Sequence, residues 1–82
     1  MRIMVDFVFP ALANALESGE REVPDCSTVA DFIALCEEQL HRRFNDSEKQ
    51  AMLFLIDSQS VSWDYTLRDG QTLRIIQIFA GG

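Results

Sequence analysis

The sequence predicts an α+β fold in which one main helix covers one face of a mixed sheet of four to five strands. Three observations predict it. The 82 residues are 48% hydrophobic and 24% charged, which suits one globular domain with a single core. One stretch, 28–44, carries apolar residues at helical spacing. Strand-like segments lie on both sides of it without the strand-helix-strand alternation that typifies a parallel sheet.

The first segment predicts a strand from Arg2 to Phe9. Every second position is apolar, namely Ile3, Val5, Phe7 and Phe9. Such alternation gives a strand one apolar face. Pro10 ends the strand, because proline cannot donate a hydrogen bond to a neighbouring strand. A turn at Ser18-Gly19 and a short strand over 21–23, ended by Pro24, then predict an N-terminal hairpin.

The middle segment predicts the main helix. Thr28 is a suitable N-cap and Asp31 follows three residues later, which resembles a capping box and places an acid at the positive end of the helix dipole. The apolar stripe consists of Val29, Phe32, Ile33, Cys36, Leu40 and Phe44. This stripe should pack on the sheet. His41 has no nucleophile signature beside it and is interpreted as a solvated helix residue.

The C-terminal half predicts the remaining strands, a buried one over 52–56 and a last one over 71–79. The other stretches are, in chain order, a polar loop over 45–50, a turn over 57–60, a short strand or irregular connection over 61–67 and a turn at 68–70. We expect a folded domain over residues 1–79 and a flexible C-terminal tail over residues 80–82.

Charge and composition exclude several classes of function. A net charge of −6 and a pI near 4.5 disfavour binding to nucleic acid or to an anionic membrane, and favour a protein partner with a basic face. Cys26 and Cys36 form no metal-binding or redox motif, so we expect buried or half-buried reduced thiols and no metal. No stretch reads as a signal peptide or a membrane span, and a cytoplasmic location is expected.

The most specific stretch is VSWDYTLRDGQTLRIIQIFAGG. It resembles the pattern of the small subunit of molybdopterin synthase: Val-Ser-aromatic-Asp, Leu-x-Asp-Gly, a hydrophobic strand and Gly-Gly. The positions that match are Val61, Ser62, Trp63, Asp64, Leu67, Asp69, Gly70, Gly81 and Gly82. With the order of elements, this makes nearly the whole chain similar to the β-grasp, ubiquitin-like sulfur carriers of the MoaD/ThiS family. Ala13 stands where the family commonly has arginine, and the two prolines that molybdopterin-type members often carry before the tail are absent.

The resemblance implies a function for the diglycine. An ATP-dependent enzyme of the ubiquitin-activating type would adenylate the carboxylate of Gly82, and sulfur from a persulfide would replace AMP to leave a thiocarboxylate. Gly81 and Ala80 complete the tail, and glycine lets the backbone pass closely through a narrow active site. The protein would be a carrier rather than an enzyme and would bind no cofactor itself, because ATP belongs to the activating enzyme.

The expected partners are that adenylating enzyme and a sulfur acceptor such as the large subunit of molybdopterin synthase. The candidate partner-binding residues are the apolar ones near the tail, Phe9, Ile76, Ile78 and Phe79. Those that lie outside the core should form an exposed apolar patch.

Two other functions stay open at this stage. The chain could be a ubiquitin-like modifier that is joined through Gly82 to lysines, although its single lysine, Lys49, disfavours lysine-linked chains. It could also be a β-grasp interaction module with an incidental diglycine. The sulfur could serve molybdopterin synthesis, the pathway expected first, or thiamine synthesis, tRNA thiolation or another pathway.

Overall fold

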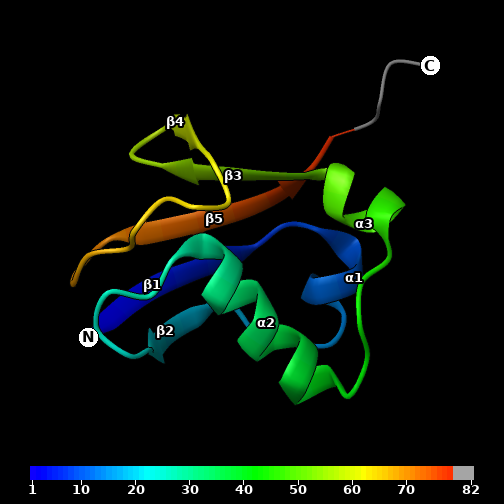
Figure 1. The fold of residues 1–82 in the computed structure, drawn as a ribbon, viewed down its shortest axis with the longest axis horizontal. Coiled ribbons are helices and arrows are strands. Elements are labelled where there is room, and N and C mark those ends of the chain that lie inside the picture. The colour runs from blue at the N-terminus through cyan, green and yellow to red at the C-terminus, as the bar shows by residue number, and fades with distance from the viewer. Residues whose placement is uncertain (79–82) are drawn as a thin grey trace.

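The fold is described from a computed structural model, which covers residues 1–78 and leaves residues 79–82 outside the described part (Figure 1). The strands are β1 (Arg2–Phe7), β2 (Gly19–Glu22), β3 (Met52–Ile56), β4 (Gln59–Val61) and β5 (Thr72–Gln77). The helices are α1 (Pro10–Ala13), α2 (Val29–Leu40) and α3 (Asp46–Gln50). The predicted order of strands around one main helix is confirmed, and two short helices are added to it.

The five strands form one mixed sheet in the order β2-β1-β5-β3-β4. β1 pairs antiparallel with β2, as predicted, but β2 runs from Gly19 to Glu22 rather than over 21–23, and α1 lies in the connection. β5 lies in the centre, parallel to β1 and antiparallel to β3. Because β1 and β5 run in the same direction, their carboxyl ends lie at the same side of the sheet, where Figure 1 also shows α1 and α3.

The core lies between α2 and one face of the sheet, as the apolar stripe predicted. Phe32 of α2 stacks on Phe7 of β1, with ring centroids 6.2 Å apart and planes 21° from parallel. The buried residues of α2 are Val29, Phe32, Ile33 and Cys36. Phe44 is also buried, but it lies beyond the helix, because α2 ends at Leu40 and His41 takes a left-handed conformation with φ 53°.

The first turn of α2 is held by its cap and by the connection that leads to β5. The Thr28 hydroxyl accepts the Asp31 N–H at 3.1 Å and the Asp31 carboxylate accepts the Thr28 N–H at 2.9 Å, which completes the predicted capping box. Two further N–H groups of the first turn, those of Val29 and Ala30, donate to the carbonyls of Tyr65 and Trp63. The connection therefore satisfies helix donors that would otherwise lack partners.

The Asp69-Gly70 turn fastens the start of β1. The Asp69 carboxylate accepts the Arg2 N–H at 2.7 Å, and the Gly70 N–H donates to the Arg2 carbonyl at 2.7 Å. Gly70 has φ 84°, a conformation that favours glycine. The predicted turn therefore also links the start of β1 to the residues that lead into β5.

Two predictions, about the end of the first strand and about residues 45–50, are corrected. The first strand ends at Phe7 rather than Phe9, because both the Val8 and the Phe9 N–H groups turn to the same Ile75 carbonyl at 2.9 Å and Phe9 becomes the N-cap of α1. The stretch 45–50 is the helix α3 rather than a loop. Its start is a second capping box, in which Asn45 and Glu48 exchange hydrogen bonds, and that pattern was visible in the sequence.

The predicted turn over 57–60 is also shorter than expected. Only Asp57 and Ser58 form it, both with positive φ, 52° and 66°. Two consecutive residues of this kind make the tight turn that matches the twist of a hairpin, so Gln59 already pairs with Ile56 and begins β4. Aspartate is common at the first of these positions, but the second is usually glycine, and serine there hides the two-residue turn in the sequence.

Replacement of Phe32 by alanine should destabilise the protein by about 3 to 5 kcal/mol, because a buried aromatic side chain is lost and the core cannot fully close over the cavity. Urea unfolding followed by circular dichroism measures this. Glu38→Ala, an exposed change on the same helix, is the control and should shift the midpoint little. An equal midpoint for Phe32→Ala and the parent protein would contradict the packing described here.

Candidate functional site

The candidate site lies where β5 reaches the side of the sheet that carries α1 and α3. One residue past the strand, the Ile78 N–H still donates to the Ala51 carbonyl at 2.8 Å, so the ladder with the β3 side continues to the last described residue. The chain is therefore fixed by backbone hydrogen bonds up to residue 78, directly before the four residues that include the diglycine.

Apolar side chains gather at this end on the face of the sheet opposite α2. Leu53 of β3 is paired with Ile76 of β5, and both are half-buried without belonging to the core cluster. Val8 and Ile78 are more open, at 48% and 41% exposure. Here we call Val8, Leu53, Ile76 and Ile78 the apolar outer patch. Exposed apolar residues grouped in this way commonly mark protein interfaces.

Charged residues border the patch along the same face. Asp6 and Arg74 are paired across β1 and β5, with the Arg74 Nε and the Asp6 Oδ2 3.1 Å apart. Both side chains are exposed, so the ion pair contributes little to stability. The outer face thus offers an apolar end near residue 78 and a charged middle.

The predicted partner-binding residues are divided by the structure. Ile76 and Ile78 lie on the apolar outer patch. Phe9 does not: its side chain is 3% exposed and belongs to the core, which corrects the expectation that it forms part of an exposed surface. The reason is the early end of β1, after which the chain turns into α1. Phe79, Ala80, Gly81 and Gly82, and with them the predicted tail over residues 80–82, lie outside the described residues.

Sequence reasoning missed Val8 and Leu53. The signal for Leu53 was present, because MLFLI is apolar at every position, whereas a strand that faces solvent on one side needs apolar residues only at alternate positions. The surplus residues, Leu53 and Leu55, are those that face away from α2. Val8 carried the same signal, because it is an apolar residue at an alternate position of the predicted strand, on the face opposite Phe7 and Phe9.

The two cysteines differ, because Cys26 is exposed, against the expectation that both thiols are at least half-buried, whereas Cys36 is buried. Burial raises the pKa of the Cys36 thiol to about 12, so this sulfur stays protonated and unreactive at neutral pH. Trp63 packs edge-on against Phe54, with centroids 4.8 Å apart. Within residues 1–78, no group of three or more His, Cys, Asp or Glu side chains is arranged to hold a metal ion, and no helix is both long and apolar enough to cross a membrane.

Comparison with known families identifies the chain. The model of the ThiS family matches residues 8–82, which is most of the sequence and includes β5 and the diglycine. The chain belongs to the ThiS family. Members of this family are small carrier proteins rather than enzymes. The exposed residues of this ThiS-family protein are therefore considered as contacts for partner proteins rather than as catalytic groups. No curated protein matches the chain by sequence.

Solved structures agree on the β-grasp fold of the ThiS-family protein. A Pyrococcus furiosus protein described as molybdopterin converting factor subunit 1 superposes with a TM-score of 0.68 at 19% identity, over 94% of this chain and 97% of that one. SAMP1 from Haloferax volcanii superposes with a TM-score of 0.70 at 16% identity, over 100% of both chains. A second structure of this H. volcanii small archaeal modifier protein 1 gives 0.68 at 13% identity, over 93% and 95%. A protein described as a molybdopterin converting factor subunit and one described as an archaeal modifier protein thus share this fold.

We expect the apolar outer patch to bind partner proteins, so Ile78→Asp should weaken binding to the adenylating enzyme by more than about 1 kcal/mol, the effect of losing an interface anchor. Calorimetric titration of the enzyme measures this, with folding confirmed by urea unfolding.

Met4→Asp is the matched control, because Met4 is 45% exposed on β1 and is paired with Thr72 at the opposite end of β5. It should leave the affinity unchanged. Equal affinities for the Ile78→Asp variant and the parent protein would remove the patch from the binding surface.

Proposed function

We propose that this ThiS-family protein is a sulfur carrier whose Gly82 carboxylate is activated and converted to a thiocarboxylate. The observation that carries the proposal is the position of the apolar outer patch beside residue 78, only a few residues before Gly81 and Gly82 in a chain that matches the family through its diglycine. A partner that binds the patch would have the reactive end of the chain within reach.

The chemistry requires an adenylating enzyme with ATP, a persulfide donor and a thiol as reductant. An oxygen of the Gly82 carboxylate attacks the α-phosphorus of ATP and pyrophosphate leaves, which gives an acyl adenylate. The terminal sulfur of a persulfide then attacks the carbonyl carbon and AMP leaves, so that an acyl disulfide forms. A thiol reduces that disulfide, takes the other sulfur into a mixed disulfide, and leaves the thiocarboxylate on Gly82.

The lack of side chains at the end of the tail supports this assignment. Gly81 and Gly82 carry no Cβ, so the backbone can pass closely through the covered site of an adenylating enzyme. The described domain would provide recognition only, through the apolar outer patch. Cys36 is not suited to act as a relay for the sulfur, because burial keeps its thiol protonated.

The acceptor that we propose first is a subunit of the molybdopterin synthase type, located with the carrier in the cytoplasm. The Pyrococcus furiosus structure described as molybdopterin converting factor subunit 1 supports this choice by its fold. The sulfur would pass from the thiocarboxylate to a precursor held by the acceptor.

Three changes at the tail test the proposal: deletion of Gly82, Gly81→Val and addition of one residue after Gly82. Each should leave the free energy of unfolding within about 0.5 kcal/mol of the parent value, because terminal residues contribute little to a packed domain. Each should abolish pyrophosphate exchange with ATP and the adenylating enzyme. Persistence of exchange in the protein that lacks Gly82 would rule out the carrier function.

Intact mass spectrometry of the protein isolated from its own cells separates carrier from modifier. Exchange of one oxygen for sulfur adds about 16 Da to the free chain, whereas conjugation gives adducts with other proteins. Adducts without the sulfur-containing form would replace the proposal by a modifier function, the one for which the H. volcanii small archaeal modifier protein 1 is named. The Gly82 deletion is the control in both cases and should show neither product.

A further inference from the structure

The edge strand β2 has backbone groups that no other strand of the sheet uses. It is the outermost strand next to β1. Met1 and Val23 exchange both of their backbone hydrogen bonds, the N-terminal amine to the Val23 carbonyl at 2.8 Å and the Val23 N–H to the Met1 carbonyl at 2.9 Å. In an antiparallel pair such exchanges alternate along the strands, so the N–H and C=O groups of Glu20 and Glu22 point away from β1.

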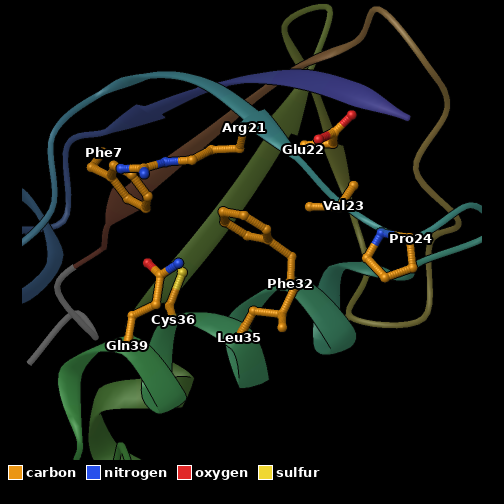
Figure 2. A pocket seen from close by; sticks show the side chains of 9 residues that line it. All are labelled: Phe7, Arg21, Glu22, Val23, Pro24, Phe32, Leu35, Cys36 and Gln39. Carbon is orange, nitrogen blue, oxygen red and sulfur yellow. The ribbon is translucent and has the colours of Figure 1, made fainter.

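An apolar groove of about 180 Å³ adjoins this edge, between β2 and α2 (Figure 2). Its apolar lining consists of Phe7, Val23, Pro24, Phe32, Leu35 and Cys36. The Arg21 guanidinium lies over the Phe7 ring, 5.7 Å from its centroid, and donates to the Glu17 carbonyl at 2.6 Å, which holds it at one end of the groove. A peptide that joins a sheet as an extra strand needs free backbone hydrogen-bonding groups and pockets for alternate side chains. The open edge of β2 offers the first and the apolar groove offers the second.

The charges on β2 select the occupant. Glu20 and Glu22 are paired with Met4 and Arg2 at alternate positions of β2, opposite in direction to Arg21, and Glu22 also borders the groove at the sheet edge. A second copy of β2 that paired antiparallel about a two-fold axis would place a glutamate opposite a glutamate in every register that pairs these residues, and like charges directly opposite are destabilising. A strand with basic residues at the same positions would place opposite charges there.

We propose that β2 and the adjoining groove bind an extended segment of a partner protein in which basic and apolar residues alternate. Side chains of a strand alternate between its two faces. The basic ones would lie beside Glu20 and Glu22, and the apolar ones would enter the groove between β2 and α2. The backbone would extend the sheet from five strands to six.

This surface is separate from the apolar outer patch. β2 lies at the outer edge of the sheet with β1 between it and β5, and the groove opens on the α2 side, whereas the patch lies on the opposite face. A partner bound at β2 would therefore leave the patch and the carboxyl end of β5 free. One protein could hold the carrier while another engages its C-terminal end.

The test uses two capped synthetic peptides, one of alternating lysine and valine and one of alternating glutamate and valine. Each is titrated into the ¹⁵N-labelled full chain and followed by amide chemical shifts. The lysine peptide should bind saturably, shift residues 20–23 and 35–39, and slow the hydrogen exchange of the Glu20 and Glu22 amides. A peptide with the same composition, but with all lysines before all valines, should not bind in this way.

Three variants make the test specific. Glu20→Lys/Glu22→Lys changes only exposed side chains. It should weaken binding of the lysine peptide at least about fivefold and should strengthen binding of the glutamate peptide. Glu38→Lys/Asp46→Lys makes the same change in net charge outside the groove and should leave the preference as it was. Leu35→Asp should weaken the lysine peptide at least about fivefold by placing a charge in the groove.

Four results would overturn the proposal. They are absence of saturable binding, shifts confined to the apolar outer patch, equal affinity for the two peptides, and an affinity that does not respond to reversal of Glu20 and Glu22. Sedimentation of the free chain as a dimer, lost in Glu20→Lys/Glu22→Lys, would assign the edge to a second copy instead.

Discussion

The parallel pairing of β1 with β5 is the constraint on which the rest of this structure depends. It joins residues that are far apart in the chain, as the Asp6–Arg74 contact across 68 positions illustrates. Closing so long a loop costs conformational entropy, and the cost has to be offset by burial and by hydrogen bonds at the junction. The sheet meets this cost with the Arg2 backbone held by Asp69 and Gly70 at one end, and with the Ile75 carbonyl shared by Val8 and Phe9 at the other.

The same pairing makes the last strand a central one. β5 has neighbours on both sides, and its inward residues Leu73 and Ile75 are fully buried. A central strand is anchored along its whole length, so the chain is held firmly up to residue 78 before the diglycine is reached. The backbone position of the last described residue, Ile78, is thus fixed by the sheet.

Within residues 1–78 there is one long helix, α2, so the two faces of the sheet differ in how they are covered. α2, with 12 residues, covers the inner face, and the core consists of its apolar stripe and the inward residues of the strands. The outer face has no such cover. There, Leu53 and Ile76 shield each other, and Val8 and Ile78 are left open. The surface available to partners is thus what remains after the core has used one face, together with the β2 edge.

The sequence by itself determined the elements whose cause is local. The alternation from Ile3 to Phe7, the Thr28-Asp31 capping box and the Asp69-Gly70 turn were all predicted and are present, since each depends on residues within one or two turns of chain. The motif from Val61 to Gly82 led to the family in the same way, and α3 could have been predicted from Asn45 and Glu48. Only the tertiary structure decided which apolar residues stay exposed. Phe9 and Ile78 both appeared as exposed candidates, yet Phe9 is in the core and Ile78 is open. The groove beside β2 likewise exists only because Phe7 and Phe32 are brought together from different elements. Burial is a property of two surfaces in contact, and where those surfaces are contributed by segments tens of residues apart, no local pattern of side chains specifies which face will be covered.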